Sequence, residues 1–128
     1  MSEPFIYLST FTVRAGHFNE ALEAAREVAR LVEAREPRML VFQLFADEAG
    51  RQITSLQVHA DAESMANHMS IAAKHIADSG SWLESVNYAV ALGQPPAVMT
   101  QWYEEAGEPL AQFSRQLAGF TRAAVPVG

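Results

Sequence analysis

The sequence predicts an α+β fold in which strands and helices follow the order strand, helix, strand, strand, helix, strand. Two observations predict it. Apolar residues recur at helical spacing in two segments, 18–32 and 62–76. Runs rich in β-branched and aromatic residues precede, separate and follow these segments. The order is that of a split βαβ arrangement, in which two helices cover one face of a four-stranded antiparallel sheet.

The first strand and the first helix have clear patterns. Residues 5–14, FIYLSTFTVR, carry apolar groups on both faces, which is typical of a strand buried on both sides. The segment after Ala15-Gly16 is amphipathic and spans about five helical turns. Glu36-Pro37 ends it, because proline cannot continue a helix. Its apolar positions are Phe18, Ala21, Leu22, Ala25, Val28, Ala29 and Val32.

A β-hairpin follows the first helix. Its strands are expected over 38–46 and 51–59, with the turn Asp47-Glu48-Ala49-Gly50 between them. In the second of these strands Leu56 and Val58 point to one side, because side chains alternate along a strand. The opposite side is polar and consists of Ser55, Gln57 and His59.

The second helix is expected from about Ala62. Asp61 is a good N-cap residue, and Glu63 lies in the first turn. The apolar stripe of this helix consists of Met65, Met69, Ala72 and Ile76. A fourth strand over 86–92 then completes a ferredoxin-like βαββαβ core.

The C-terminal part extends this core. Gly93-Gln94-Pro95-Pro96 breaks the strand pattern, and 96–106 is expected to form a short third helix. The stretch PLAQFSRQLAGFTRAAVPV is expected to be extended, with a bulge or bend at Gly119. We therefore expect one domain over 1–128, with a core of about 4–92 and a helix-and-strand extension of about 93–128.

Composition excludes several classes of function. The chain has 128 residues, no cysteine and a net charge of −6. An acidic chain without a local basic cluster repels phosphate backbones, so nucleic acid is not expected as a partner. No apolar stretch approaches the roughly 20 residues that span a bilayer, so no membrane partner is expected. The N-terminus lacks a signal-peptide pattern, and the absence of cysteine agrees with a cytoplasmic location.

The split βαβ arrangement leaves one face of the sheet without helices. We expect this bare face to carry large apolar side chains, namely Phe5, Tyr7, Phe11, Phe42 and Leu44. A hydrophobic sheet face of that size needs a second layer. The same face of a second copy, related by a two-fold axis, is the simplest one, so a homodimer is predicted.

Three segments resemble a known family. They are FTVRAGHFNEALEA, EPRMLVFQLFADEAGRQITSLQVHAD and ADAESMANHM. Together they are similar to the dimeric α/β-barrel superfamily, particularly its antibiotic-biosynthesis-monooxygenase-like branch. The resemblance implies a homodimer whose two sheets close into a barrel. It also implies a ligand cavity in each subunit, between the sheet and the helices or within the barrel.

The segment HADAESMANHMSIAAKH holds three of the four histidines. His68 occupies the position of the family's helix-two histidine, and His75 lies on the same edge of the apolar stripe. His59 ends the third strand, above Gln57. A histidine here is suited to act as a general base near neutral pH, since its unperturbed pKa is about 6.5. The alternative is that His68 makes a structural hydrogen bond and His75 is solvated.

Cofactor-independent oxygenation, which the resemblance brings into consideration, needs a base that removes a phenolic proton. His68 and His59 are the candidate catalytic residues. It also needs polar groups that hold the resulting anion. The candidate substrate-binding residues are Asn67, Gln57, Tyr88, Arg14 and His75. Trp82 or Trp102 would stack on an aromatic substrate.

A metal site is not expected. The chain has no HExxH motif and no histidine pair at i,i+4 spacing. His68 and His75 are separated by about 10 Å along the helix axis, from the rise of 1.5 Å per residue, which is too far to share one ion easily. We likewise expect no cofactor.

Two functions remain open. The favoured expectation is a homodimeric barrel protein that binds a small apolar or aromatic molecule. The alternative is a cofactor-independent monooxygenase acting on an aromatic or polyketide-like substrate with a histidine base. The family's common Glu and Trp at the end of the third strand are replaced here by Gln57 and His59, which favours the first.

Overall fold

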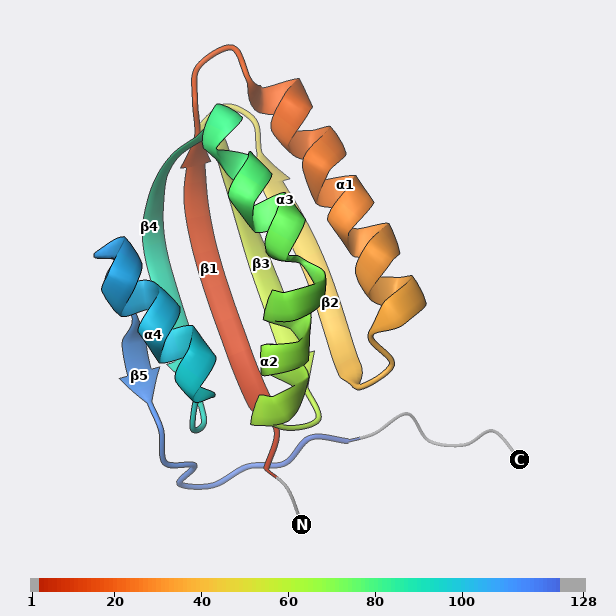
Figure 1. Ribbon diagram of the computed structural model, residues 1–128, viewed down its shortest axis with the longest axis vertical. Coiled ribbons are helices and arrows are strands. Elements are labelled where there is room, and N and C mark those ends of the chain that lie inside the picture. Colours follow the sequence, from red (N-terminus) through yellow and green to blue (C-terminus); the bar gives the residue numbers. More distant parts are fainter. Residues whose placement is uncertain (1–2, 123–128) are drawn as a thin grey trace.

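A computed structural model describes residues 3–122 of the chain. In chain order the elements are β1 (Phe5–Val13), α1 (Phe18–Arg35), β2 (Met39–Asp47), β3 (Gln52–His59), α2 (Ala62–Ile71), α3 (Ala73–Asp78), the 3-10 turn η1 (Ser79–Ser81), β4 (Leu83–Leu92), α4 (Ala97–Ala106) and β5 (Ala111–Phe113). The strands form one sheet in the order β2-β3-β1-β4-β5. The four helices lie on one face of this sheet (Figure 1).

The predicted α+β class and the ferredoxin-like core are confirmed. β1 pairs with β3 and β4, and β2 pairs with β3, all antiparallel. The helix expected over 96–106 is α4, and Asp61 caps α2 by accepting a hydrogen bond from the backbone N–H of Ser64 at 3.0 Å. The extension adds β5, which pairs with β4 in parallel, so the sheet is mixed. Of the stretch expected to be extended, 123–127 lie outside the described residues.

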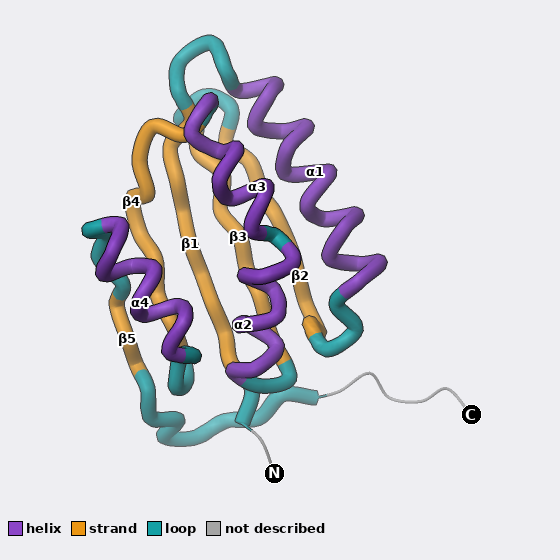
Figure 2. Tube along the Cα trace, in the orientation of Figure 1, coloured by secondary structure: helices purple, strands orange, loops and turns teal. Residues whose placement is uncertain are grey.

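Two boundaries differ from those expected. β4 begins at Leu83 rather than at residue 86. The second helix is interrupted at Ala72, whose ψ of 1° departs from helical values, and continues as α3 in a new direction (Figure 2). Both segments still lie over the sheet, so the interruption changes the path of the helix rather than the layer to which it belongs.

The face of the sheet that the helices cover is the opposite of the one expected. Phe5 is buried beneath the helices, and Tyr7, Phe11, Phe42 and Leu44 border the space between the sheet and the helices. The bare side carries their strand neighbours. By register these include Ile6, Leu8, Val41, Leu56 and Val58. β1 is apolar on both faces, so alternation alone could not decide which face the helices cover.

The core joins the extension to the rest of the sheet. One cluster of buried side chains combines Phe5 of β1, Met65 of α2 and Met99 and Tyr103 of α4. Met99 is fully buried. A second cluster, around Val13 and Ile53, lies under the beginning of α1. Since α4 shares its core with β1 and α2, it is packed as a part of the sheet's helical layer.

The shared core predicts that the extension and the sheet unfold together. Met99→Ala should lower the free energy of unfolding by about 2–5 kcal/mol, because it leaves a cavity beside Phe5. The neighbouring change Val98→Ala should stay within about 0.5 kcal/mol, since the Val98 side chain is largely exposed. Urea unfolding followed by circular dichroism measures both. Two separate transitions would show that the extension folds on its own.

Candidate active site

A cavity of about 270 Å³ lies between the sheet and the helices. Most of its walls are apolar. Representative wall residues are Val28 of α1, Met69 of α2, Ile76 of α3 and Trp102 of α4. Trp82 also lines the cavity. Both tryptophans that were expected to stack on an aromatic ligand therefore border this space. A concave apolar space with a few polar groups is the usual form of a small-molecule site.

The polar groups of this cavity come mainly from the sheet. β3 turns Ser55 and Gln57 toward the helices, and β1 turns Ser9 and Tyr7 toward them. Ser9 and Ser55 lie directly opposite each other and their hydroxyls are 2.9 Å apart. Tyr7 lies opposite Gln57 in the same way. The floor of the cavity is thus a polar strip across two central strands.

His68 is held by a carboxylate. Its Nδ1 lies 2.9 Å and 3.1 Å from the two carboxylate oxygens of Glu36, the residue that follows α1. Both side chains are buried, with 7% and 1% of their surfaces exposed. A carboxylate at Nδ1 fixes the proton there and leaves Nε2 as the atom with a free electron pair. The His68 ring also borders the cavity.

His59 is held by two neighbours behind the floor. Its Nδ1 lies 2.8 Å from the Ser64 hydroxyl, and its Nε2 lies 2.9 Å from the amide oxygen of Gln57. The other end of the Gln57 amide, its nitrogen, is 3.5 Å from Nε2 of His68. Gln57 therefore connects the two histidines.

These contacts assign one consistent direction of hydrogen bonding. The Ser64 hydroxyl donates to His59, His59 donates to the amide oxygen of Gln57, and the Gln57 amide donates to Nε2 of His68. His68 then donates from Nδ1 to Glu36. The bond between Gln57 and His68 is at the long limit for a hydrogen bond. The electron pair on Nε2 of His68 is therefore only weakly engaged and is available to a ligand.

His59 is neutral at ordinary pH. Burial and, to a smaller extent, the neighbouring His68 lower its pKa to about 4, while Asp61 acts in the opposite sense. A neutral His59 fits both of its hydrogen bonds, with the Ser64 hydroxyl donating to one ring nitrogen. His59 is thus a fixed support for Gln57.

Two tyrosines complete the polar part of the cavity. The hydroxyls of Tyr7 and Tyr103 are in contact with each other, and both residues border the cavity. Burial raises the pKa of each, so both phenols stay protonated at neutral pH. They are hydrogen-bond donors of a site that otherwise has few.

The structure brings together four of the seven residues proposed from the sequence. His68, Gln57 and His75 border the cavity, and His59 lies directly behind Gln57. Asn67 is on the exposed side of α2 and does not border the cavity. Arg14 is also exposed, and its Nε donates to the carbonyl oxygen of Leu83 at 3.0 Å.

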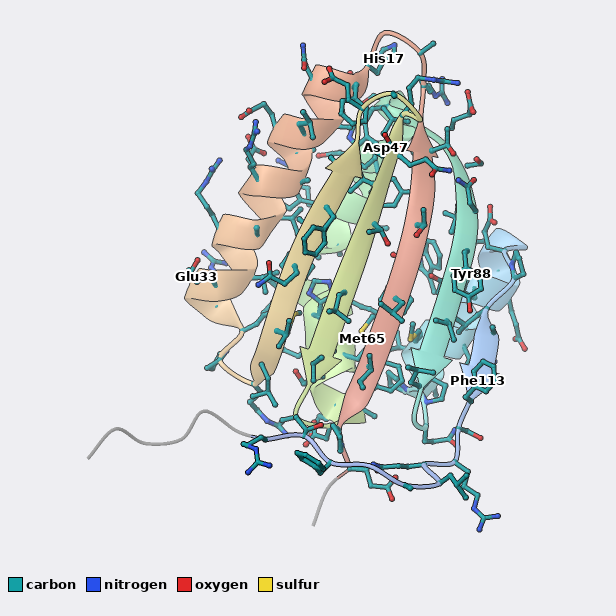
Figure 3. The ribbon with its side chains drawn as sticks, turned by 180° about the vertical axis from the view of Figure 1, so that it is seen from behind. His17, Glu33, Asp47, Met65, Tyr88 and Phe113 are labelled. Atoms are coloured by element: carbon teal, nitrogen blue, oxygen red, sulfur yellow. The ribbon has the colours of Figure 1, made fainter. Side chains whose placement is uncertain are left out.

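Tyr88 lies on the bare face of the sheet. It pairs with Thr10 and is 56% exposed, and Figure 3 shows it on the side turned away from the helices. Tyr88 was a candidate for contact with a ligand held either between the sheet and the helices or within the barrel. Its position on the bare face keeps it away from this cavity. No sequence pattern fixes which face it occupies, because an irregularity in the pairing of β1 and β4 follows Thr10.

Four residues of this site were not found from the sequence. Glu36 was interpreted as a helix end, and Ser64 was not singled out. Tyr7 was assigned to the bare face, and Tyr103 to the extension. The signal available was the polar side of β3, since a strand rarely turns Ser, Gln and His together toward a helical layer unless they have partners there.

Within residues 3–122, no group of three or more His, Asp and Glu side chains is arranged to hold a metal ion. The described helices also include none that is long and apolar enough to cross a membrane.

Solved structures share this fold. MupZ from Pseudomonas fluorescens is 16% identical, with a TM-score of 0.75, and the match covers 98% of this chain and 100% of MupZ. A candidate antibiotic biosynthesis monooxygenase from Bacteroides thetaiotaomicron is 18% identical, with a TM-score of 0.61 and coverage of 66% of this chain and 84% of that one. A further candidate of this class from Caulobacter crescentus is 19% identical, with a TM-score of 0.61 and coverage of 70% and 86%.

These comparisons establish the fold. The chain has the α+β fold of structures like the antibiotic biosynthesis monooxygenases, as its sequence resemblance implied. The matches to the two monooxygenase candidates leave about a third of this chain uncovered, whereas the match to MupZ covers nearly all of it. No protein-family model matches the chain, and no curated protein matches it.

The depressed pKa of His59 predicts a pH dependence of stability. Below its unfolded pKa of about 6.5 the unfolded chain binds a proton that the folded chain does not, so stability falls as pH decreases toward 4. The full effect of this one group is about 3 kcal/mol. Urea unfolding at several pH values between 7 and 4 should show this loss in the wild type and a smaller loss in His59→Gln. Parallel curves for the two proteins would contradict the assignment.

Proposed function

We propose that the protein is an enzyme that binds a small, largely apolar molecule in the cavity and removes a proton from it with His68. The observation that carries this proposal is the continuous hydrogen-bond chain from Ser64 through His59, Gln57 and His68 to Glu36. It orients Nε2 of His68 in the wall of an apolar cavity. The Glu36 carboxylate at Nδ1 would stabilise the imidazolium that forms when Nε2 takes a proton from a ligand in the cavity.

A purely structural role for this chain explains less. A buried carboxylate is costly unless it is paired, and His68 supplies the partner for Glu36. An apolar pair of similar size would fill the same space without that cost. A carboxylate that orients an imidazole at the edge of a cavity is, by contrast, a common catalytic arrangement, because it fixes the tautomer and stabilises the imidazolium that forms when the ring takes a proton. A protein that only binds its ligand has no need of such an arrangement.

A cofactor-independent monooxygenase is the second candidate. The likeness in fold to candidate antibiotic biosynthesis monooxygenases favours it. In this reaction His68 takes the proton of a phenol, and molecular oxygen then oxidises the phenolate. The substrate supplies all four electrons, one oxygen atom is retained as a carbonyl, and the other leaves as water. Trp82 and Trp102 border the space in which an aromatic ring would lie.

We infer that the protein is a homodimer. The bare face of the sheet carries Ile6, Leu8, Leu56 and Val58, and beside them Phe45 is 59% exposed. An exposed apolar face of this extent is typical of a protein interface. Two such faces related by a two-fold axis cover each other. The cytoplasm remains our prediction for the location of the dimer, because the chain has no cysteine.

The base can be tested without knowing the natural substrate. 5-Nitrobenzisoxazole is an apolar compound that opens to a coloured cyanophenolate when a base removes its ring C–H proton. The wild type should accelerate this opening, and His68→Ala should slow it by about 100-fold or more. Glu36→Gln should give an intermediate rate, because a neutral amide supports the imidazole less than a carboxylate does.

His17→Ala is the matched control. His17 is exposed at the beginning of α1 and does not border the cavity, so its removal should leave the rate unchanged. Equal rates for the wild type and His68→Ala would remove His68 from the chemistry. A panel of electron-rich phenols, assayed for oxygen uptake with the same variants, separates oxygenation from proton transfer alone.

The dimer is tested by its mass in solution. Light scattering at micromolar concentration should give the mass of two chains for the wild type. Leu8→Arg places a charge at the centre of the bare face and should give the mass of one chain, since a buried unpaired charge is strongly unfavourable. Asn67→Arg adds the same charge on the helical side and should remain dimeric. A wild type with the mass of one chain would exclude this interface.

A further inference from the structure

Tyr7 and Tyr103 bring two phenolic hydroxyls into contact in the wall of the cavity. Tyr7 belongs to β1, and Tyr103 belongs to α4 of the extension. A hydrogen bond between two hydroxyls uses one of their two protons. The contact between the two tyrosines does not use the second proton, so the pair can donate it to another acceptor.

The hydroxyl pair lies near the proposed base. Tyr7 is directly opposite Gln57 in the pairing of β1 with β3, and side chains at such positions are neighbours, with Cβ atoms about 5 Å apart. The Gln57 amide in turn contacts Nε2 of His68. The strand positions of Tyr7 and Gln57 are therefore neighbours, and the base, the glutamine and both tyrosines border the same cavity.

No arginine or lysine is among the described residues that border the cavity, so a negative charge on a ligand would be held by neutral donors or by histidine. Both tyrosines stay protonated because burial raises the pKa of each. Neutral donors aimed into an apolar space stabilise developing negative charge on oxygen more than they would in water. The arrangement suits a reaction in which charge moves onto an oxygen atom of the ligand.

We propose that Tyr7 and Tyr103 hold the carbonyl oxygen of the substrate while His68 removes a proton from the adjacent carbon. This inference rests on the proposed function and adds the substrate class, a small and largely apolar carbonyl compound with a C–H bond next to the carbonyl. The C–H bond breaks and its proton goes to Nε2 of His68. The electron pair forms a carbon–carbon double bond, and the carbonyl oxygen becomes an enolate oxygen that accepts the tyrosine hydrogen bond.

The extension has a chemical part in this scheme. Tyr103 reaches the cavity because α4 packs against β1 and α2 through the cluster that contains Met99 and Phe5. A core without the extension would retain Tyr7 alone. The hydroxyl of Tyr7 would then lose the Tyr103 hydroxyl that polarises it, since hydrogen bonds in a chain strengthen one another.

Two ligands of the same shape test the oxygen site. 2-Acetylnaphthalene has a carbonyl group, and 2-ethylnaphthalene has the same apolar body without it. The double variant Tyr7→Phe/Tyr103→Phe should bind the acetyl compound about ten-fold more weakly than the wild type does and the ethyl compound equally well. Each single variant should lose less affinity for the acetyl compound than the double variant does, because the remaining hydroxyl still donates. Tyr88→Phe makes the same chemical change on the bare face and should alter neither affinity.

Deuterium exchange at the methyl group next to the carbonyl tests the chemistry. In heavy water the wild type should introduce deuterium into 2-acetylnaphthalene, followed by mass spectrometry. The double tyrosine variant should slow this exchange about 100-fold. His68→Ala should stop it and leave the affinity within a few-fold of the wild type. Thermal unfolding by circular dichroism verifies that every variant is folded.

The outcomes separate the two proposals. Selective loss of acetyl binding in the double variant without exchange in the wild type supports the oxygen site and overturns His68 as the base. Exchange that needs His68 but is unaffected by the double variant overturns the tyrosine pair. The tyrosine pair is also overturned if the double variant binds each compound as tightly as the wild type does. The same follows if the wild type binds neither compound.

Discussion

The structure depends on the orientation of β3. This strand turns Ser55, Gln57 and His59 toward the helices and Leu56 and Val58 away from them, the reverse of what burial of apolar side chains alone would favour. Polar side chains beneath a helical layer must find partners there, because a buried polar group without a hydrogen bond is costly. The helical layer therefore has to supply Glu36, Ser64 and His68 at matching positions. It also cannot close completely on the sheet, which leaves the cavity.

The same orientation accounts for the bare face. Since the polar side of β3 is inside, its apolar side joins Ile6 and Leu8 of β1 on the outside. The fold thus has two functional surfaces, a polar floor under the helices and an apolar face that we propose is covered by a second copy. Among the described residues, no buried side-chain nitrogen or oxygen lacks a hydrogen-bond partner. Each buried polar atom of the floor therefore has at least one partner without ligand, and the weakest of these contacts is the long one between Gln57 and His68.

The extension changes the composition of the cavity rather than the topology of the core. β5 lengthens the sheet at the edge of β4, and α4 places Met99, Trp102 and Tyr103 against the space between sheet and helices. The match to MupZ covers 98% of this chain and so includes most of this part, whereas the match to a smaller structure of the same fold covers 66% of the chain. A scaffold of this kind hosts many reactions. The groups that reach the cavity from outside the core are then a natural source of specificity.

The sequence by itself determined the elements, their order and the ferredoxin-like arrangement, because these follow from periods of two and 3.6 residues and from local signals such as Asp61 and Pro37. It also indicated His68, His59 and Gln57, since polar side chains stood where a buried strand or an apolar stripe was expected. Only the tertiary structure decided which face of the sheet the helices cover, and with it the positions of Tyr7 and Tyr88. Contacts such as that between Glu36 and His68, 32 residues apart, depend on how α1 and α2 pack together. No local pattern encodes such a contact, because it arises from the packing of two elements whose own periodicities are satisfied without it.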